Sequence, residues 1–259
     1  MRDPGLDEAL RAAGGVGSLA RKIGISQPSV SNWSRIPAER VLSVEAATGV
    51  SRTTLRPDLY AEHPGIGDDV DEVDAARAQE YALISVLLAR APDQALLDRL
   101  ATLRGDASPL GLAHAALAEA ASRSNAELVE REFFNLFIGL GRGELLPYGS
   151  YYLTGFLHER PLARLRESLA RLGIERVAGQ AEPEDHAAIL CEIMAGLASR
   201  RLQAPPGADG DLFEDHLAPW IGRFFADLER AEAADFYRRV GSLGRTFMEI
   251  ETEALALPS

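Results

Sequence analysis

Apolar residues along most of this 259-residue chain recur every three or four positions, which is the spacing of a buried helix face. Val129, Phe133 and Leu136 follow this spacing in one such segment, and glutamates fall between them. No run shows the alternation of apolar and polar residues that a half-buried strand needs. The chain is therefore predicted to be all-α.

The predicted helices fall into two groups. In the first 60 residues several short helices are separated by glycines. Longer helices are predicted further along the chain, at residues 75–90, 93–104, 108–121, 124–138, 159–172, 183–202, 211–229 and 232–255.

An acidic stretch, HPGIGDDVDEVD at residues 63–74, stands between these groups and carries proline and glycine. Such a composition is typical of a linker. We predict a small domain at residues 1–62, an acidic linker at 63–75 and a larger helical domain at 76–259. A second break, APPGADGD at 204–211, separates two helices inside the larger domain.

Charge is distributed unequally between the two domains. Residues 1–60 hold eight basic and six acidic side chains, a net charge of +2, whereas the rest holds nineteen basic and thirty-three acidic, a net charge of −14. An acidic surface repels nucleic acid and suits a cationic ligand, but it also arises for solubility alone. Both interpretations of the larger domain stay open.

Composition excludes several classes of protein. No apolar run is long enough for a membrane span, and the polar N-terminus does not fit a signal peptide. The single cysteine, Cys191, allows no intramolecular disulfide and no cysteine-based zinc site, so we expect a cytoplasmic protein without metal or cofactor. The GLGRGE run at 139–144 lacks the lysine and hydroxyl of a phosphate-binding loop, which disfavours a nucleotide hydrolase.

Residues 16–35 read VGSLARKIGISQPSVSNWSR, with apolar positions for two short helices and Gly24 at the turn between them. Ser26 is predicted to cap the second helix, and Pro28 is tolerated in its first turn. The pattern resembles the helix-turn-helix of Cro-type and phage-repressor proteins. The following IPAERVLSVEAATGVSRTTLRPDLY resembles the small Cro-like proteins related to YdaS.

This resemblance implies that a helix from Gln27 to Arg35 lies in the major groove of DNA. Pro28 removes one base contact, and a net charge of +2 is small for a DNA-binding domain. The alternative is a helix-turn-helix kept for docking or dimerisation. If DNA is bound, the predicted contacts to bases and phosphates are Gln27, Ser29, Ser31, Asn32 and Arg35.

Three motifs mark the larger domain. They are EREFFNLFIGLGRGELLPYGSYYLTG, then EPEDHAAILCEIMAGL from Glu182, then HLAPWIGRFF from His216. Asp185 next to His186 could suggest acid–base chemistry, but neighbouring helical residues point about 100° apart and no nucleophile is evident. By itself, this stretch is better interpreted as a helix N-terminus with Glu182 and Glu184 in an acidic first turn.

The order of the three motifs resembles the TorD, DmsD and NarJ family of cytoplasmic chaperones for molybdenum enzymes, over residues 76–256. The resemblance implies an all-helical, non-enzymatic protein that captures the leader of a redox enzyme, commonly a twin-arginine signal peptide. Such a leader needs carboxylates beside an apolar, aromatic-edged groove. The implied leader-binding residues are Leu146, Tyr148, Tyr151, Tyr152, Phe156, Glu182, Glu184, Asp185 and His186.

An alternative for the tyrosines is a role as core or interface aromatics, and His216 and Trp220 are expected to be packed structure. The preferred function is a chaperone for the leader or apo form of a molybdoenzyme before export. The run PYGSYYLTGFLHERPLARLR resembles members encoded with formate dehydrogenases. A transcription regulator with a chaperone-like sensor domain is the alternative, and whether the chain forms a homodimer is left open.

Overall fold

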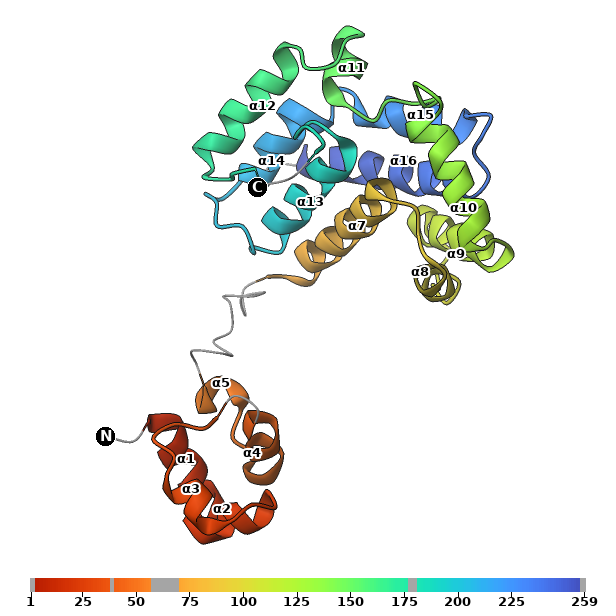
Figure 1. Cartoon of the computed structure of the whole chain (residues 1–259). Coiled ribbons are helices and arrows are strands. Elements are labelled where there is room, and N and C mark those ends of the chain that lie inside the picture. The colour runs from red at the N-terminus through yellow and green to blue at the C-terminus, as the bar shows by residue number, and fades with distance from the viewer. Residues whose placement is uncertain (1–2, 38–39, 57–69, 177–180, 257–259) are drawn as a thin grey trace. The chain divides into compact units, whose positions relative to one another are not determined.

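The computed structural model describes residues 3–37, 40–56, 70–176 and 181–256. Every regular element in these ranges is helical, and the extended pairing among them is one antiparallel bridge between Tyr148 and His186. The prediction of an all-α protein is confirmed. Two compact units form, Met1–Gly67 and Asp68–Ser259, and each is described by itself (Figure 1).

The N-terminal unit packs short helices around a core that includes the fully buried Leu6, Leu19 and Ile36. Asp3 begins the first helix by accepting the N–H of Gly5 at 3.0 Å. The unit contains α1 (Pro4–Ala13), α2 (Val16–Lys22), α3 (Gln27–Ser31), α4 (Val41–Thr48) and α5 (Arg52–Leu55).

The turn between α2 and α3 has the predicted chemistry. Gly24 adopts a left-handed conformation with φ 70°, and the hydroxyl of Ser26 accepts the N–H of Ser29 at 3.3 Å. However, α3 ends at Ser31, four residues before the predicted end. The residues that follow are not helical. The carbonyl of Ser34 accepts a hydrogen bond from the N–H of Asp3 at 2.9 Å, which ties this segment to the start of α1.

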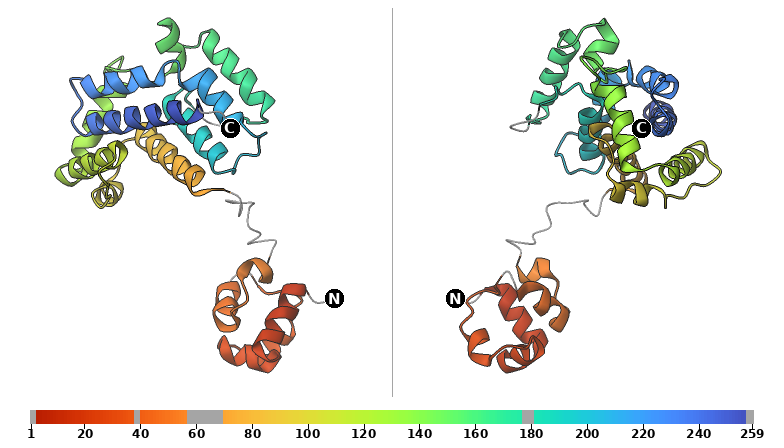
Figure 2. Two further views of the ribbon diagram at one scale, coloured as in Figure 1. Left: turned by 180° about the vertical axis from the view of Figure 1, so that it is seen from behind. Right: turned by 45° about the vertical axis from the view of Figure 1, so that its right-hand side comes forward.

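The larger unit is a bundle in which α13 lies along α7, while α16 packs against α15 and α9 (Figures 1 and 2). Helices α11 and α12 lie together at one edge of the unit. Its elements are α7 (Glu72–Ala89), α8 (Gln94–Leu100), α9 (Pro109–Arg123), α10 (Ala126–Phe133), η2 (Phe134–Ile138), α11 (Gly149–Thr154), α12 (Arg160–Arg171), α13 (Ala187–Ala198), α14 (Ala208–Leu212), η3 (Phe213–Leu217), α15 (Ile221–Arg230) and α16 (Phe236–Leu255).

Side-chain caps set the starts of the first four helices of this unit. Asp71, Asp93, Ser108 and Asn125 each accept a backbone N–H from the first turn that follows. Because α7 already begins at Glu72, the last four residues of the predicted linker are helical. The part of that linker before residue 70 lies outside the described residues.

A close helix–helix contact and a buried ion-pair network hold the long C-terminal helix α16 in place. A Cβ added at Gly244 would lie 2.3 Å from the Phe225 ring, so only glycine allows α15 and α16 this close approach. Arg77 of α7 donates at 2.9 Å both to Glu251 of α16 and to Asp209 of α14. The Glu251 carboxylate is 1% exposed and is satisfied by this guanidinium and by a Tyr81 hydroxyl at 2.9 Å.

Three helix predictions in the second half need correction. No helix was predicted at 143–156, but this run contains α11. The helix predicted at 183–202 spans Ala187–Ala198, because Glu184 and Asp185 form a turn and the extended His186 pairs with Tyr148. The helix predicted at 211–229 is interrupted at Trp220, whose φ of −144° is not helical.

Candidate functional site

The PYGSYYL and EPEDH segments, distant in sequence, are joined by backbone hydrogen bonds. The N–H of Ala187 donates to the carbonyl of Pro147 at 2.8 Å, and the N–H of Gly149 donates to the carbonyl of Asp185 at 2.9 Å. This pairing sets the first turn of α11 beside the N-terminus of α13. The two motifs therefore form one junction.

Asp185 holds this junction from inside. Its Oδ2 accepts the N–H of Ser150 at 2.7 Å, and the residue is 3% exposed. Among the described residues, its Oδ1 and the Ser150 hydroxyl are buried without a hydrogen-bond partner. The carboxylate thus acts as a cap for α11. The contact between Asp185 and a ligand stays a prediction, and in this structure the carboxylate is buried.

Tyr148 and His186 pack on each other at the junction, with ring centroids 5.0 Å apart. The half-buried Tyr148 donates its hydroxyl to the exposed Glu182. Burial lowers the pKa of His186, whose Nδ1 accepts the N–H of Ala188 at 3.1 Å and caps α13. His186 is therefore a buried capping residue. Glu182 and Glu184 precede the cap and do not form the acidic first turn that was predicted.

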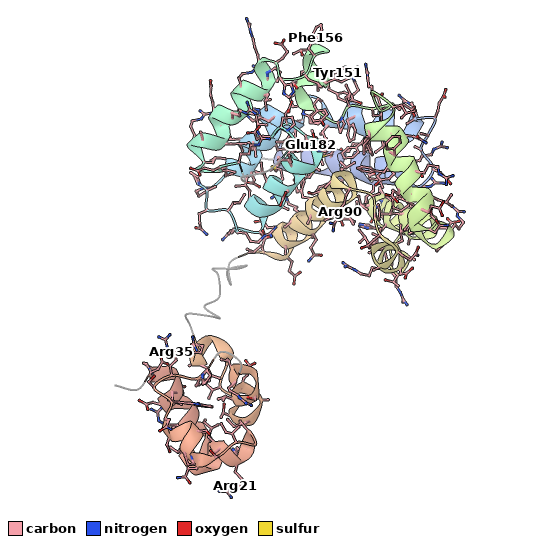
Figure 3. All side chains as sticks on the ribbon, viewed as in Figure 1. Arg21, Arg35, Arg90, Tyr151, Phe156 and Glu182 are labelled. Atoms are coloured by element: carbon pink, nitrogen blue, oxygen red, sulfur yellow. The ribbon has the colours of Figure 1, made fainter. Side chains whose placement is uncertain are left out.

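The remaining aromatic and apolar residues of the predicted site separate into core and surface. Tyr152 is 8% exposed and packs on the ring of Trp220 at 5.6 Å, which supports its interpretation as a core aromatic. Leu146 and Tyr151 are half-buried. Phe156 is 68% exposed and lies with Tyr151 at the α11 edge (Figure 3).

His216 and Trp220 are packed as predicted. Trp220 is 2% exposed, and its indole N–H donates to the carbonyl of His216 at 2.7 Å. The His216 ring is hydrogen-bonded to Ser168 of α12 at 2.9 Å. These residues attach the η3 segment to α12.

Glu184 differs from its neighbours because it reaches a groove. Arg166 of α12 donates to Glu184 Oε2 through Nε at 2.9 Å and Nη2 at 2.8 Å. Burial acts to raise the pKa of Glu184, but the hydrogen bond from Arg166 and the charges of Arg166 and Arg176 outweigh it and lower the pKa. The carboxylate is therefore held in its charged form.

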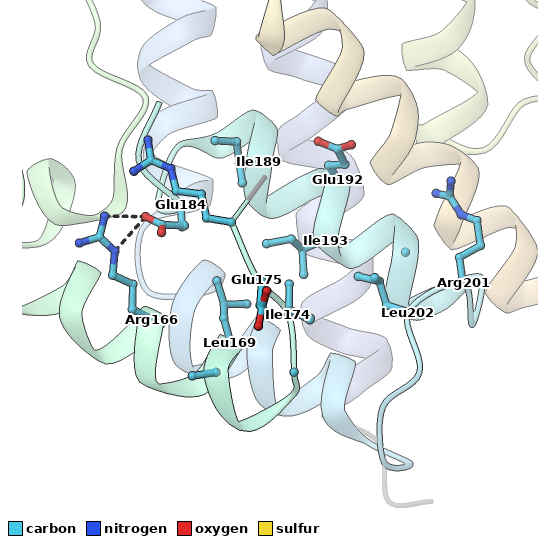
Figure 4. A pocket seen from close by; sticks show the side chains of 14 residues that line it. Arg166, Leu169, Ile174, Glu175, Glu184, Ile189, Glu192, Ile193, Arg201 and Leu202 are labelled. Carbon is cyan, nitrogen blue, oxygen red and sulfur yellow. Dashed lines mark hydrogen bonds and ion pairs between the residues drawn. The ribbon is translucent and has the colours of Figure 1, made fainter. Parts of the chain in front are cut away.

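The groove lies between α12 and α13 and has a volume of about 570 Å³ (Figure 4). Its size is that of a pocket for a few apolar side chains. Larger apolar side chains come from both helices and the segments that follow them: Leu169, Ile174, Ile189, Ile193 and Leu202. Charged side chains of both signs border it: Arg166, Glu175, Arg176, Glu184, Glu192 and Arg201.

Of the predicted ligand-binding residues, Glu184 is the one that lines this groove. Sequence reasoning missed the rest of the lining, including Arg166, Glu192 and the α13 isoleucines. A signal was present, since Ile189 and Ile193 are four residues apart and lie on one helix face. Together with Leu169 on the neighbouring helix α12, these apolar residues could have indicated a groove between the two helices.

The N-terminal unit leaves its predicted DNA-contacting side chains exposed. Gln27, Ser29 and Ser31 are exposed on α3, and Asn32 and Arg35 are exposed just beyond it. Arg35 also forms an ion pair with Asp3 at 3.4 Å. The buried Val30 fixes α3 on the core, so these polar groups remain on the outer face.

Two other kinds of site were searched for in the described part of the chain. No group of three or more His, Cys, Asp or Glu residues there could hold a metal ion. Within the same residues, no helix has both the length and the apolar character needed to cross a bilayer.

Two family models match the chain, one for each unit. Residues 103–226 match the family described as nitrate reductase delta subunit, and residues 6–64 match the family described as bacterial toxin YdaS. The YdaS match ends at residue 64, within the predicted linker at 63–75, and the other match begins beyond that linker.

Curated relatives match as well. The TorD chaperone of Vibrio cholerae is 29% identical over 52% of this chain and 66% of its own length, just under two thirds. The TorD chaperone of Vibrio atlanticus is 26% identical over 73% of this chain and 98% of its own length. A probable Tat proofreading chaperone DmsD of Haemophilus influenzae is 29% identical over 44% and 56%.

A solved structure from Archaeoglobus fulgidus, named as that of a candidate redox enzyme maturation protein, aligns with a TM-score of 0.45 and 20% identity, over 68% of this chain and 93% of that chain. The family matches and the curated relatives agree with the motifs of the two units. The larger unit is similar to the TorD and DmsD chaperones and matches the nitrate reductase delta subunit family, and the N-terminal unit is similar to the YdaS family.

Proposed function

We propose that the larger unit is a non-enzymatic cytoplasmic chaperone that binds the leader or the apo form of a molybdoenzyme before export. The observation that carries this proposal is the groove between α12 and α13, which has apolar side chains inside and carboxylates at its border. The relatives are named as chaperones, and none is named as an enzyme.

The groove matches the chemistry of a twin-arginine leader. Such a peptide carries two guanidinium groups followed by an apolar stretch. Glu184 and the exposed Glu192 provide carboxylates for the cations, and Ile189 and Ile193 provide apolar contact for the stretch that follows. The sequence PYGSYYLTGFLHERPLARLR favours a formate dehydrogenase as the client.

Calorimetry of the full-length chain with a panel of synthetic twin-arginine leader peptides tests the proposal. Glu192→Gln should weaken binding, and the loss should shrink as salt is raised because it is electrostatic. Ile189→Ala should weaken binding with little dependence on salt, since it removes apolar contact area. Glu127→Gln is the matched control, because Glu127 is exposed on α10 and does not line the groove.

A parent chain that binds no leader peptide would contradict this form of the proposal and direct attention to the mature client. If both groove variants bind as tightly as the control, the leader site lies elsewhere.

We propose a second function, duplex DNA binding, for the N-terminal unit. The exposure of Gln27, Ser29 and Asn32 on or beside a capped helix supports it. In the full-length chain, Gln27→Ala and Asn32→Ala should reduce sequence preference more than nonspecific affinity, and binding should weaken with salt. Absence of binding to genomic fragments at low salt would favour a docking or dimerising module.

A further inference from the structure

The Arg166–Glu184 ion pair at the border of the groove is unequal in exposure. The Glu184 side chain is 11% exposed, whereas the Arg166 side chain is 49% exposed. Both guanidinium contacts reach across from α12 to the same carboxylate oxygen, as the dashed lines in Figure 4 show. The carboxylate is thus a fixed part of the groove, while the guanidinium lies toward solvent.

Position in the chain explains why Glu184 is fixed. It immediately precedes Asp185, whose side chain and carbonyl are bonded to the start of α11. A carboxylate held this way and removed from most water needs a cation. Arg166 is an exposed partner on a long flexible side chain, and a contact of that kind contributes little free energy and is screened by salt.

We propose that Arg166 is an internal stand-in for an arginine of the client peptide. The incoming guanidinium takes over Glu184, Arg166 turns out into solvent, and the apolar residues of the peptide enter the groove toward Ile189 and Ile193. This inference rests on the proposed leader-binding function. The site already holds a guanidinium with two N–H donors, so its fit to this group is seen directly.

Displacement of Arg166 has a measurable consequence. Free peptide competes with a tethered group for one carboxylate, so Arg166 lowers the apparent affinity for the leader. Arg166→Ala should therefore bind an arginine-bearing leader about threefold to fivefold more tightly, the range that an exposed ion pair corresponds to. Replacing the two leader arginines with lysine should remove most of this gain, since lysine has no fork of donors.

The control for charge is Arg164→Ala. Arg164 is an exposed arginine on the same helix, and it does not line the groove. The Arg164→Ala substitution removes one positive charge from the same helix, as Arg166→Ala does, but leaves the Arg166–Glu184 ion pair intact. The difference between the two variants isolates competition from long-range electrostatics.

The experiment is calorimetric titration of the full-length parent, Arg166→Ala, Arg164→Ala and the double variant Arg166→Ala/Glu184→Gln with a twin-arginine leader peptide that binds the parent. Tighter binding by Arg166→Ala than by Arg164→Ala, abolished in the double variant, is expected. If Arg166→Ala binds no more tightly than Arg164→Ala, the inference is overturned while leader binding by the parent still stands. If Arg166→Ala loses its helical circular dichroism signal, Arg166→Lys is used in its place. This variant should bind the leader peptide about twofold more tightly than the parent. Unchanged affinity would overturn the inference.

Discussion

The Oδ2 atom of Asp185 accepts a hydrogen bond from the backbone N–H of Ser150 at 2.7 Å, across 35 positions of sequence. This bond ties the start of α11 to the segment before α13. Two of the three motifs that mark the larger unit meet at this contact, and it holds the segment that carries Glu184 of the groove.

Asp185→Ala should destabilise the larger unit by about 1–3 kcal/mol, because the Ser150 N–H is left buried without its acceptor. Urea unfolding monitored by circular dichroism measures this free energy. Asp98→Ala, an exposed aspartate on α8, is the control and should stay within about 0.5 kcal/mol of the parent. A stable Asp185→Ala that nonetheless binds leader poorly would restore Asp185 as a ligand-contacting residue.

Gly244→Ala should cost about 1–3 kcal/mol in the free energy of unfolding, since its Cβ would overlap the Phe225 ring and force α15 and α16 apart. Gly222→Ala provides a matched comparison on α15, where an added Cβ meets nothing within 4 Å. That change should be neutral or stabilise by up to about 1 kcal/mol, because alanine favours the helix. Equal midpoints for the two variants in thermal unfolding would refute the close approach.

The helices could be predicted from sequence because periodicity and caps are local. Ser26 was expected to cap α3, and it does. Helix α11 was missed for the opposite reason. Pro147 and Gly149 favour a loop locally, and the aspartate that caps this helix lies 35 positions away. A pairing between distant segments cannot be found from the spacing of residues within either one.

The sequence predicted which motifs form the candidate site, but it did not predict which of their side chains are exposed. Carboxylates at Glu182, Glu184 and Asp185 look equivalent in sequence, yet one is exposed, one lines the groove and one is buried in the junction. Which of them meets a ligand depends on how α12 and α13 pack. Arg166 ends the run PYGSYYLTGFLHERPLARLR, but nothing in that run indicates a role for it, so its pairing with Glu184 became visible only in the fold.

Glu251→Gln should destabilise the larger unit by about 3 kcal/mol, because Arg77 would keep its charge in a mostly buried place without its main partner. Differential scanning calorimetry of the full-length chain measures the loss for the larger unit. Glu253→Gln, an exposed position on the same helix, should leave the transition unchanged. Similar transitions for both variants would show that the network contributes little.

His114 should make the stability of the larger unit depend on pH. Its hydrogen bond with Glu80, 3.1 Å from Nε2 to Oε2, raises the pKa of His114, and the charges of Glu80 and Asp106 add to this against the opposing effect of burial. The folded pKa therefore lies above the unfolded value of about 6.5. The stabilisation is complete below that value and is lost as pH rises through the folded pKa.

His114→Gln should be less stable than the parent at pH 6, and the difference in the free energy of unfolding should narrow toward pH 8 in urea unfolding. His158→Gln, at an exposed position, is the control measured alongside it. A difference for His114→Gln that stays constant between pH 6 and pH 8 would mean that folding does not raise the pKa of this histidine.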